Sequence, residues 1–237
     1  MAGLRRAEAA ATAAQAGRPR PERPRLAHAA SRRALVAAAR ALHDRGFNPR
    51  RAGNASLRAG RGFLITPTGM DYDAMGPADI VAMSLDGTAR GRRAPSSEWR
   101  FHADILRARP EFGAVLHAHP PHATALACLG KPIPAFHYMV AAAGGADIRC
   151  APYATFGSRA LSRNALKALA DRRACLLANH GMIACGADLD DALGLAEEVE
   201  ALARQYLLAL AAGRPRLLPA REMAKVLRLF EDYGARL

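Results

Sequence analysis

Apolar positions recur at helical spacing in several parts of the chain. Between residues 26 and 45, Leu35, Ala38, Ala39 and Leu42 fall on one face of a helix, and Gly46 follows as a stop signal. The segment Pro95-Ser96-Ser97-Glu98 marks the start of a second helix that extends to about Arg109, just before a proline. Similar patterns and end signals predict four more helices, over residues 122–129, 158–170, 189–211 and 220–233.

Short runs of apolar residues between these helices predict strands. Asp86-Gly87 is typical of a tight turn after one of them. The predicted strands cover residues 55–58, 62–66, 80–84, 114–119, 147–150, 174–178 and 182–185. Because helices and strands alternate along one chain of this length, we expect a single layered α/β domain.

The N-terminal segment has a different composition. Residues 1–25 are mostly alanine, arginine and proline, with little apolar patterning. Such a segment can bury little surface and its prolines interrupt helices, so we interpret it as a disordered tail before a domain that spans residues 26–237. An arginine-rich mitochondrial leader is an alternative, although the segment contains no serine.

The charge balance suggests a nucleic-acid partner at first, since the formal net charge of the 237 residues is +13. Much of it comes from residues 1–51, which hold twelve arginines against three acidic residues and show no interleaved stacking aromatics. We therefore consider nucleic-acid binding unlikely. No apolar run approaches the roughly 18 residues of a membrane span. The four cysteines are scattered, which favours free buried thiols and a soluble, cytoplasmic protein.

Three histidines form a candidate metal site. His117 and His119 stand two apart in a predicted strand, so both imidazoles lie on the same face. His180 ends another predicted strand. Three imidazoles suit a four-coordinate zinc ion whose shell is completed by a carboxylate or water. Taken singly, each of these histidines could equally be a hydrogen-bonded structural residue.

Three glycine- or serine-containing segments form a candidate phosphate site. The segments 53–56 and 66–70 are tight loops whose backbone N–H groups could surround an anion. Ser96 and Ser97 stand at a predicted helix start, where the helix dipole also attracts anions. The alternative is that Ser96 only caps this helix and that Glu98 only complements its dipole.

Together these segments carry a family resemblance. The order GN-x-S, TPTG, SSEWRFH, HxHP, HYM, APYATFG and NHG resembles the class II aldolase/adducin family over roughly residues 28–237, and within it the bacterial L-fuculose-1-phosphate aldolases. The resemblance implies a central, mostly antiparallel β-sheet flanked by helices, a zinc-dependent lyase and a cyclic homotetramer.

The resemblance also implies roles for individual residues. The implied zinc ligands are Glu98, His117, His119 and His180, with Glu98 also the catalytic base. Tyr138 is implied to donate a proton in the site of a neighbouring subunit, and Tyr233 to shape the aldehyde end of the substrate site. The implied phosphate-binding residues are Gly53, Asn54, Thr68, Gly69, Ser96 and Ser97.

Two departures from the family pattern concern the substrate. Arg50 and Arg51 precede Ala52 and Gly53 where the family usually carries Gly-Thr, which changes the phosphate loop or brings a guanidinium beside the phosphate. Asn179 stands where similar members often have a second histidine, and we expect little consequence.

Other functions within the same superfamily remain open. Pentulose-phosphate 4-epimerases, rhamnulose-phosphate aldolases and a methylthioribulose-phosphate dehydratase share its metal and phosphate motifs. Adducin-like heads, which bind cytoskeletal protein without the metal residues, are a non-enzymatic alternative. The full set of four candidate ligands in this chain argues against it.

Overall fold

An eight-stranded sheet forms the centre of the protein, as a computed structural model describes it for residues 28–231. The strand order is β4-β3-β2-β1-β5-β8-β7-β6, and every pair is antiparallel except β6 with β7. The strands are β1 (Asn54–Ala59), β2 (Gly62–Ile65), β3 (Val81–Ser84), β4 (Ala89–Arg90), β5 (Ala114–Ala118), β6 (Cys150–Ala151), β7 (Ala174–Leu177) and β8 (Gly181–Gly186). The predicted α/β domain with a mostly antiparallel sheet is confirmed.

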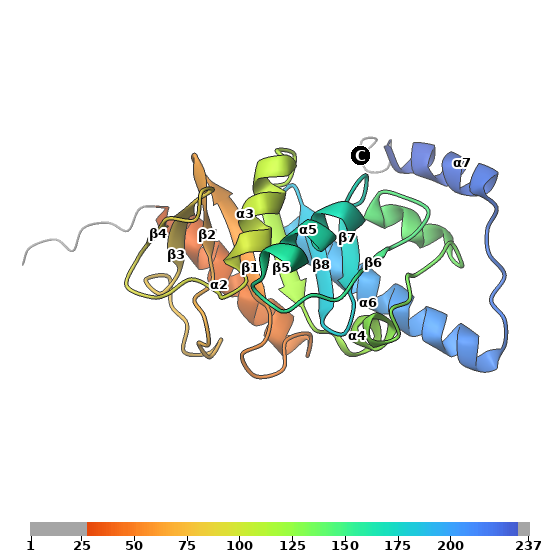
Figure 1. Ribbon diagram of the computed structural model, residues 1–237, viewed down its shortest axis with the longest axis horizontal. Helices are drawn as coiled ribbons and strands as arrows, with labels where there is room; N and C mark the ends of the chain where they lie inside the picture. The colour runs from red at the N-terminus through yellow and green to blue at the C-terminus, as the bar shows by residue number, and fades with distance from the viewer. Residues whose placement is uncertain (1–27, 232–237) are drawn as a thin grey trace, which may run out of the picture.

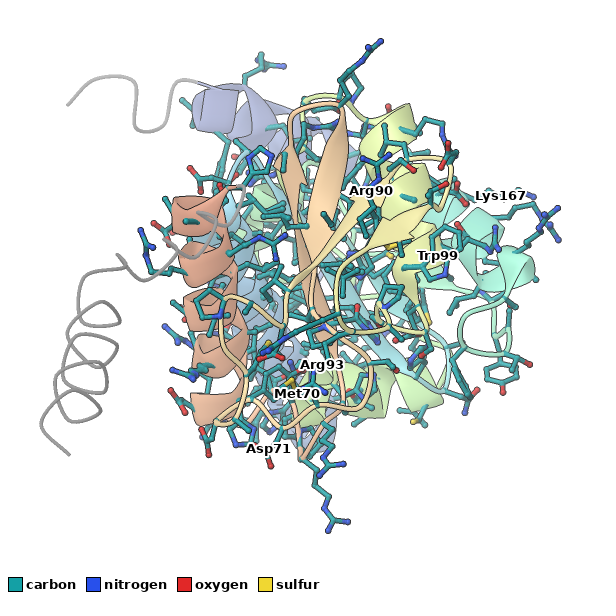
Figure 2. All side chains as sticks on the ribbon, turned by 90° about the vertical axis from the view of Figure 1, so that its left-hand side faces the viewer. Met70, Asp71, Arg90, Arg93, Trp99 and Lys167 are labelled. Carbon is teal, nitrogen blue, oxygen red and sulfur yellow. The ribbon has the colours of Figure 1, made fainter. Side chains whose placement is uncertain are left out.

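Helices cover both faces of this sheet. The helices are α2 (Ala29–Asp44), α3 (Trp99–Ala108), α4 (Pro121–Cys128), the 3-10 helix η1 (Tyr138–Ala143), α5 (Arg159–Ala168), α6 (Leu189–Ala212) and α7 (Ala220–Glu231). Figure 1 shows how they are distributed along the sheet. Viewed from the edge, α2 lies on one side of the sheet and α3 with α5 on the other (Figure 2). The first side also carries α4 and α6.

Alternation along the strands divides the core into two layers. In β5, Leu116 contributes to the layer under α2 and α6, whereas Val115 contributes to the layer under α3 and α5. His117 is two residues beyond Val115 and therefore faces the α3 side, as do Asn54 and Ser56 of the neighbouring strand, which pair with His117 and Val115. The sheet thus presents polar side chains to α3 at one place in an otherwise apolar layer.

Several element boundaries differ from those predicted. Helix α3 begins at Trp99 rather than within residues 95–98, because Ala94 and Ser96 bond to the loop after β2 and residues 97–98 form a turn. The strand predicted at 147–150 is shifted to Cys150–Ala151. Strand β4 and helix η1 have no counterpart in the prediction, since two exposed residues and one apolar 3-10 segment carry no diagnostic periodicity.

The C-terminal part extends beyond the sheet. Helix α6 continues into residues 213–219, which lead to α7 at the end of the molecule (Figure 1). Helix α7 packs on η1, and Leu208, Leu217 and Leu229 remain exposed here. Among residues 28–231, no helix is long and apolar enough to cross a membrane. The predicted tail, residues 1–25, and Tyr233 lie outside the described residues.

Candidate metal and phosphate site

The three candidate histidines meet at one end of the sheet. His117 is on β5, His119 follows that strand, and His180 is the last residue of the turn between β7 and β8. Strand β8 pairs with β5, which brings His180 next to the other two. The three rings offer nitrogen atoms that all lie within 4.8 Å of one another, and the Nε2 atoms of His117 and His119 are 2.9 Å apart. This spacing suits a shared cation.

Glu98 joins the triad from the start of α3. Its Oε2 lies 3.1 Å from Nε2 of His117, and its Oε1 lies 3.4 Å from Nε2 of His180. Oε1 is buried and has no hydrogen-bond partner. A buried carboxylate oxygen without a donor is costly unless a cation neutralises it. Three imidazoles and one carboxylate are therefore a donor set that fits a divalent ion such as zinc.

The protonation states in the cluster also suit a metal. Burial, followed by the neighbouring His117, lowers the pKa of His119 to about 3 and that of His180 to about 4, so both rings are neutral near pH 7. Burial acts to raise the pKa of Glu98, but the facing His117 and His180 outweigh it and hold the pKa well below its usual range. The same contact raises the pKa of His117 against the effect of burial. A cation binding here would displace the proton of His117.

A cavity of about 380 Å³ opens beside the triad. Glu98, His119 and His180 line it, whereas His117 is completely buried behind them. The cavity is also lined by all six residues predicted to bind phosphate: Gly53, Asn54, Thr68, Gly69, Ser96 and Ser97. The structure therefore brings the metal and phosphate candidates to one place.

Backbone hydrogen bonds join the candidate phosphate loops into one wall. The N–H of Ser96 donates to the carbonyl of Thr66, and the N–H of Thr68 donates to the carbonyl of Ala94. The Ser96 hydroxyl accepts from the N–H of Glu98 at 3.3 Å, but the N-cap of α3 is Glu98, without a side-chain cap, so the alternative role of Ser96 as the helix cap is wrong. Ser96 and Glu98 line the cavity as well, so this end of α3 opens onto it.

The loop before β1 has a conformation that requires glycine. Gly53 has φ +76°, and a Cβ there would lie 2.2 Å from Oδ1 of Asn48. The hydroxyl of Tyr72 also holds the loop, because it lies 2.7 and 3.0 Å from the carbonyl oxygens of Ala52 and Gly53 and can donate to either of them. Arg51 lines the cavity, so one of the two arginines that stand where the family usually carries Gly-Thr lies at this site.

Some cavity residues were not singled out from the sequence. Tyr153 and Phe156, in the loop before α5, are 63% and 65% exposed although they are large and aromatic. The APYATFG motif that contains them was the available signal. Met70 also lines the cavity. Together with Asp71 and Arg93 it lines a second hollow, and Figure 2 shows these three residues near one another and Lys167 well away from them. Asn179 has φ +55°, a left-handed conformation that asparagine tolerates better than most residues.

Tyr138 does not line this cavity. It begins η1 and its side chain is 52% exposed. It stacks on His137, with ring centroids 4.9 Å apart. Within one chain, therefore, Tyr138 is a surface residue rather than a member of the metal cluster.

Comparisons with known proteins agree with this geometry. The family model described as "Class II Aldolase and Adducin N-terminal domain" matches residues 33–207. A 5-methylthioribulose-1-phosphate/5-deoxyribulose-1-phosphate aldolase of Rhodospirillum rubrum is 57% identical over 86% of this chain and 93% of its own. An L-fuculose phosphate aldolase of Escherichia coli is 50% identical over 81% of this chain and 90% of its own. A solved L-fuculose 1-phosphate aldolase superposes with a TM-score of 0.82 and 40% identity over 84% of this chain and 95% of that one.

Proposed function

The chain belongs to the class II aldolase and adducin family, and we propose that it is a metal-dependent aldolase that cleaves a ketose 1-phosphate into dihydroxyacetone phosphate and a short aldehyde. The observation that carries the proposal is the single cavity lined by the phosphate-loop residues together with Glu98, His119 and His180. A phosphate anchored at one part of this cavity would hold the ketose next to the metal cluster.

The phosphate would bind to the wall formed by three loops. Its contacts in this proposal are Gly53, Asn54, Thr68, Gly69, Ser96 and Ser97, with Arg51 as an additional cation at the edge. Backbone N–H groups and hydroxyls at the start of a helix complement a phosphate dianion. Binding energy at this end would be used to orient the reacting carbons.

Glu98 would be the base. The metal, which we propose to be one zinc ion per chain bound by Glu98, His117, His119 and His180, would act as a Lewis acid on the ketose oxygens. In the direction of synthesis, Glu98 would accept the proton from carbon 3 of dihydroxyacetone phosphate. Its Oε1 has no hydrogen-bond partner, and this oxygen would take that proton once the substrate had displaced it from the metal.

The aldehyde part of the substrate determines which ketose is cleaved. We propose L-fuculose 1-phosphate, which would release L-lactaldehyde, and a cytoplasmic reaction. The 57% identity to a 5-methylthioribulose-1-phosphate/5-deoxyribulose-1-phosphate aldolase favours a second candidate, a 5-deoxy- or 5-methylthio-ribulose 1-phosphate. Both candidates end in an apolar group, which suits the exposed rings of Tyr153 and Phe156 at the cavity.

A homotetramer would complete the site. Tyr138 would reach the cavity of a neighbouring subunit and protonate the aldehyde oxygen, and Tyr233 would border the aldehyde end. Tyr138 is exposed and lies outside the cavity of its own chain. Exposed leucines lie on α6 and α7, the two helices that contact η1. Such apolar surface is typical of contacts between subunits.

One assay panel tests the proposal. Purified, metal-loaded protein is given ketose 1-phosphates with methyl, methylthio, hydroxymethyl and phosphorylated ends, and release of dihydroxyacetone phosphate is followed by a coupled dehydrogenase. We expect chelator-sensitive cleavage of the first two groups and the highest kcat/KM among them for the true substrate. The proposal would be refuted if none of these substrates released dihydroxyacetone phosphate and elemental analysis found less than one divalent metal ion per chain.

A further inference from the structure

A second polar cluster extends from the wall of the cavity into the buried layer between β1 and α3. It consists of Asn54 and Ser56 on β1 and His102 on α3, all buried. Residues two apart on a strand share a face, and residues four apart on a helix share a face. Asn54 and Ser56 therefore face the same helix turn that carries Glu98 and His102. None of the roles implied by the family resemblance involves Ser56 or His102.

Hydrogen bonds connect the four side chains in a row. The Nδ2 of Asn54 is 3.0 Å from Oε2 of Glu98. The Oδ1 of the same amide is 2.5 Å from Nε2 of His102, and Nδ1 of His102 is 2.7 Å from the Ser56 hydroxyl. His102 is completely buried and stacks on Phe101 with ring centroids 4.6 Å apart. The ring is thus fixed in orientation by packing as well as by both nitrogens.

The chemistry of the groups sets the direction of every bond. The Glu98 carboxylate only accepts, so Asn54 donates to it through its NH₂ group. The amide oxygen at the other end must then accept, so His102 donates through Nε2–H. Its Nδ1 is left as an acceptor for the Ser56 hydroxyl. The ring stays neutral because burial lowers the pKa of His102 to about 3. The opposite amide orientation would set two oxygens against each other.

We propose that His102 is a positioning residue for the base. Ser56 holds the His102 ring in its Nε2–H form, and this N–H fixes the Asn54 amide. The amide in turn holds Oε2 of Glu98, which leaves Oε1 directed to the metal cluster. This inference rests on the proposed function for the role of Glu98, and it assigns Asn54 a second task beside phosphate binding. One N–H of its NH₂ group is used for Glu98 and the other remains for an anion.

It follows that loss of His102 should affect proton transfer by Glu98 more than binding of the substrate. A freely rotating Glu98 would present Oε1 to carbon 3 for only part of the time, because the oxygens of an unheld carboxylate exchange positions. Loss of the His102 bond should therefore lower the rate of proton removal. The KM for dihydroxyacetone phosphate should change little, because the phosphate contacts other than Asn54 do not depend on His102. Groups that orient a metal site from behind typically change activity about 10–100-fold when removed.

The test uses exchange of the carbon-3 proton of dihydroxyacetone phosphate with D₂O, followed by proton NMR, in the metal-loaded oligomer. His102→Leu should slow exchange about 10–100-fold with little change in KM. His102→Gln, whose amide nitrogen can still donate to Asn54, should recover most of the rate. Ser162→Ala is the matched control, since it removes another buried serine hydrogen bond, 2.6 Å to Asp104, away from the cavity. It should exchange like the wild type.

Two outcomes of the exchange experiment overturn the inference. One is a His102→Leu protein that exchanges at the wild-type rate. The other is a folded His102→Gln protein that is as slow as His102→Leu, because then the donated hydrogen bond is not what matters. Absence of exchange in the wild type would instead refute the proposed function, since Glu98 would not be a base for this substrate.

A measurement on the wild-type protein removes the dependence on turnover and uses a variant only to assign a signal. Solid-state NMR of protein with ¹⁵N-labelled histidine reports which ring nitrogen carries the proton, and His102→Gln identifies the signal by its loss. We expect the neutral Nε2–H form of His102 both before and after metal loading. An Nδ1–H form or a charged ring would contradict the row of hydrogen bonds and overturn the proposal.

Discussion

At the scale of single residues, Glu98 has the most specific role. It is buried, faces two histidines and keeps one oxygen without a hydrogen bond. We expect Glu98→Gln to lower cleavage by on the order of 10²–10⁴, because the amide cannot accept the proton. Binding of dihydroxyacetone phosphate, measured by calorimetry, should persist because the phosphate loops are unchanged. A variant with near-normal turnover would exclude Glu98 as the base.

Gly181 has a steric role beside the metal cluster. A Cβ at this position would lie 2.5 Å from the carbonyl oxygen of Ala118 and 2.5 Å from Cδ2 of His119. We expect Gly181→Ala to displace the His119 ring and to weaken zinc binding about 10–100-fold in a competition titration of metal-free protein. The motif NHG thus needs its glycine because the backbone at Gly181 lies close to Ala118 and the His119 ring.

Gly194 provides the matched control for this substitution. It lies within α6 and a Cβ there would meet nothing within 4 Å. Gly194→Ala should leave zinc affinity unchanged and should stabilise the protein by about 0.5–1 kcal/mol, since alanine loses less backbone entropy in a helix. Equal zinc affinity in the two variants would show that the approach to His119 is tolerated.

At the scale of elements, α6 holds the start of α4. The two carboxylate oxygens of Glu200 accept from the backbone N–H groups of His122 and Ala123 at 3.0 and 2.8 Å. These N–H groups are in the first turn of α4 and have no partner within the helix. Because α4 begins two residues after His119, the same contacts fix the end of the metal-binding segment.

Replacement of Glu200 tests this anchor. Glu200→Ala should lower the free energy of unfolding by about 1–3 kcal/mol, because it leaves buried donors unsatisfied. Urea denaturation at fixed protein concentration measures the loss. Glu197→Ala, in the same helix, removes only an exposed ion pair with Arg45 and should cost about 0–1 kcal/mol. Equal losses in both variants would show that α4 does not depend on this cap.

At the scale of the whole molecule, the proposed site spans two subunits. If Tyr138 serves a neighbouring chain, co-expression of inactive Tyr138→Phe and Glu98→Gln chains should restore part of the activity. Some sites would then combine an intact Glu98 with an intact Tyr138. A mixed oligomer verified by mass spectrometry that stays inactive would assign Tyr138 to its own chain or to no site. Each variant alone, expressed at the same level, gives the baseline.

Much of the fold followed from local pattern. The apolar spacing in residues 26–45 predicted the buried face of α2, and the apolar run in residues 114–118 predicted a strand that is buried on both faces. Alternation along that strand predicted that His117 and His119 share a face. Helix α3 was less predictable. Its predicted first turn is absent because Ser96 donates its N–H to the carbonyl of Thr66, about thirty residues earlier in the chain.

The sequence by itself determined most of the elements, the buried face of α2 and the three histidines as candidate ligands. Only the tertiary structure decided that β8 pairs with β5, so that His180 joins His117, and that α3 brings Glu98 and His102 onto Asn54. Those contacts depend on strand order and helix packing over long sequence separations, which no local pattern encodes. The unpartnered oxygen of Glu98 and the buried His102 became visible for that reason.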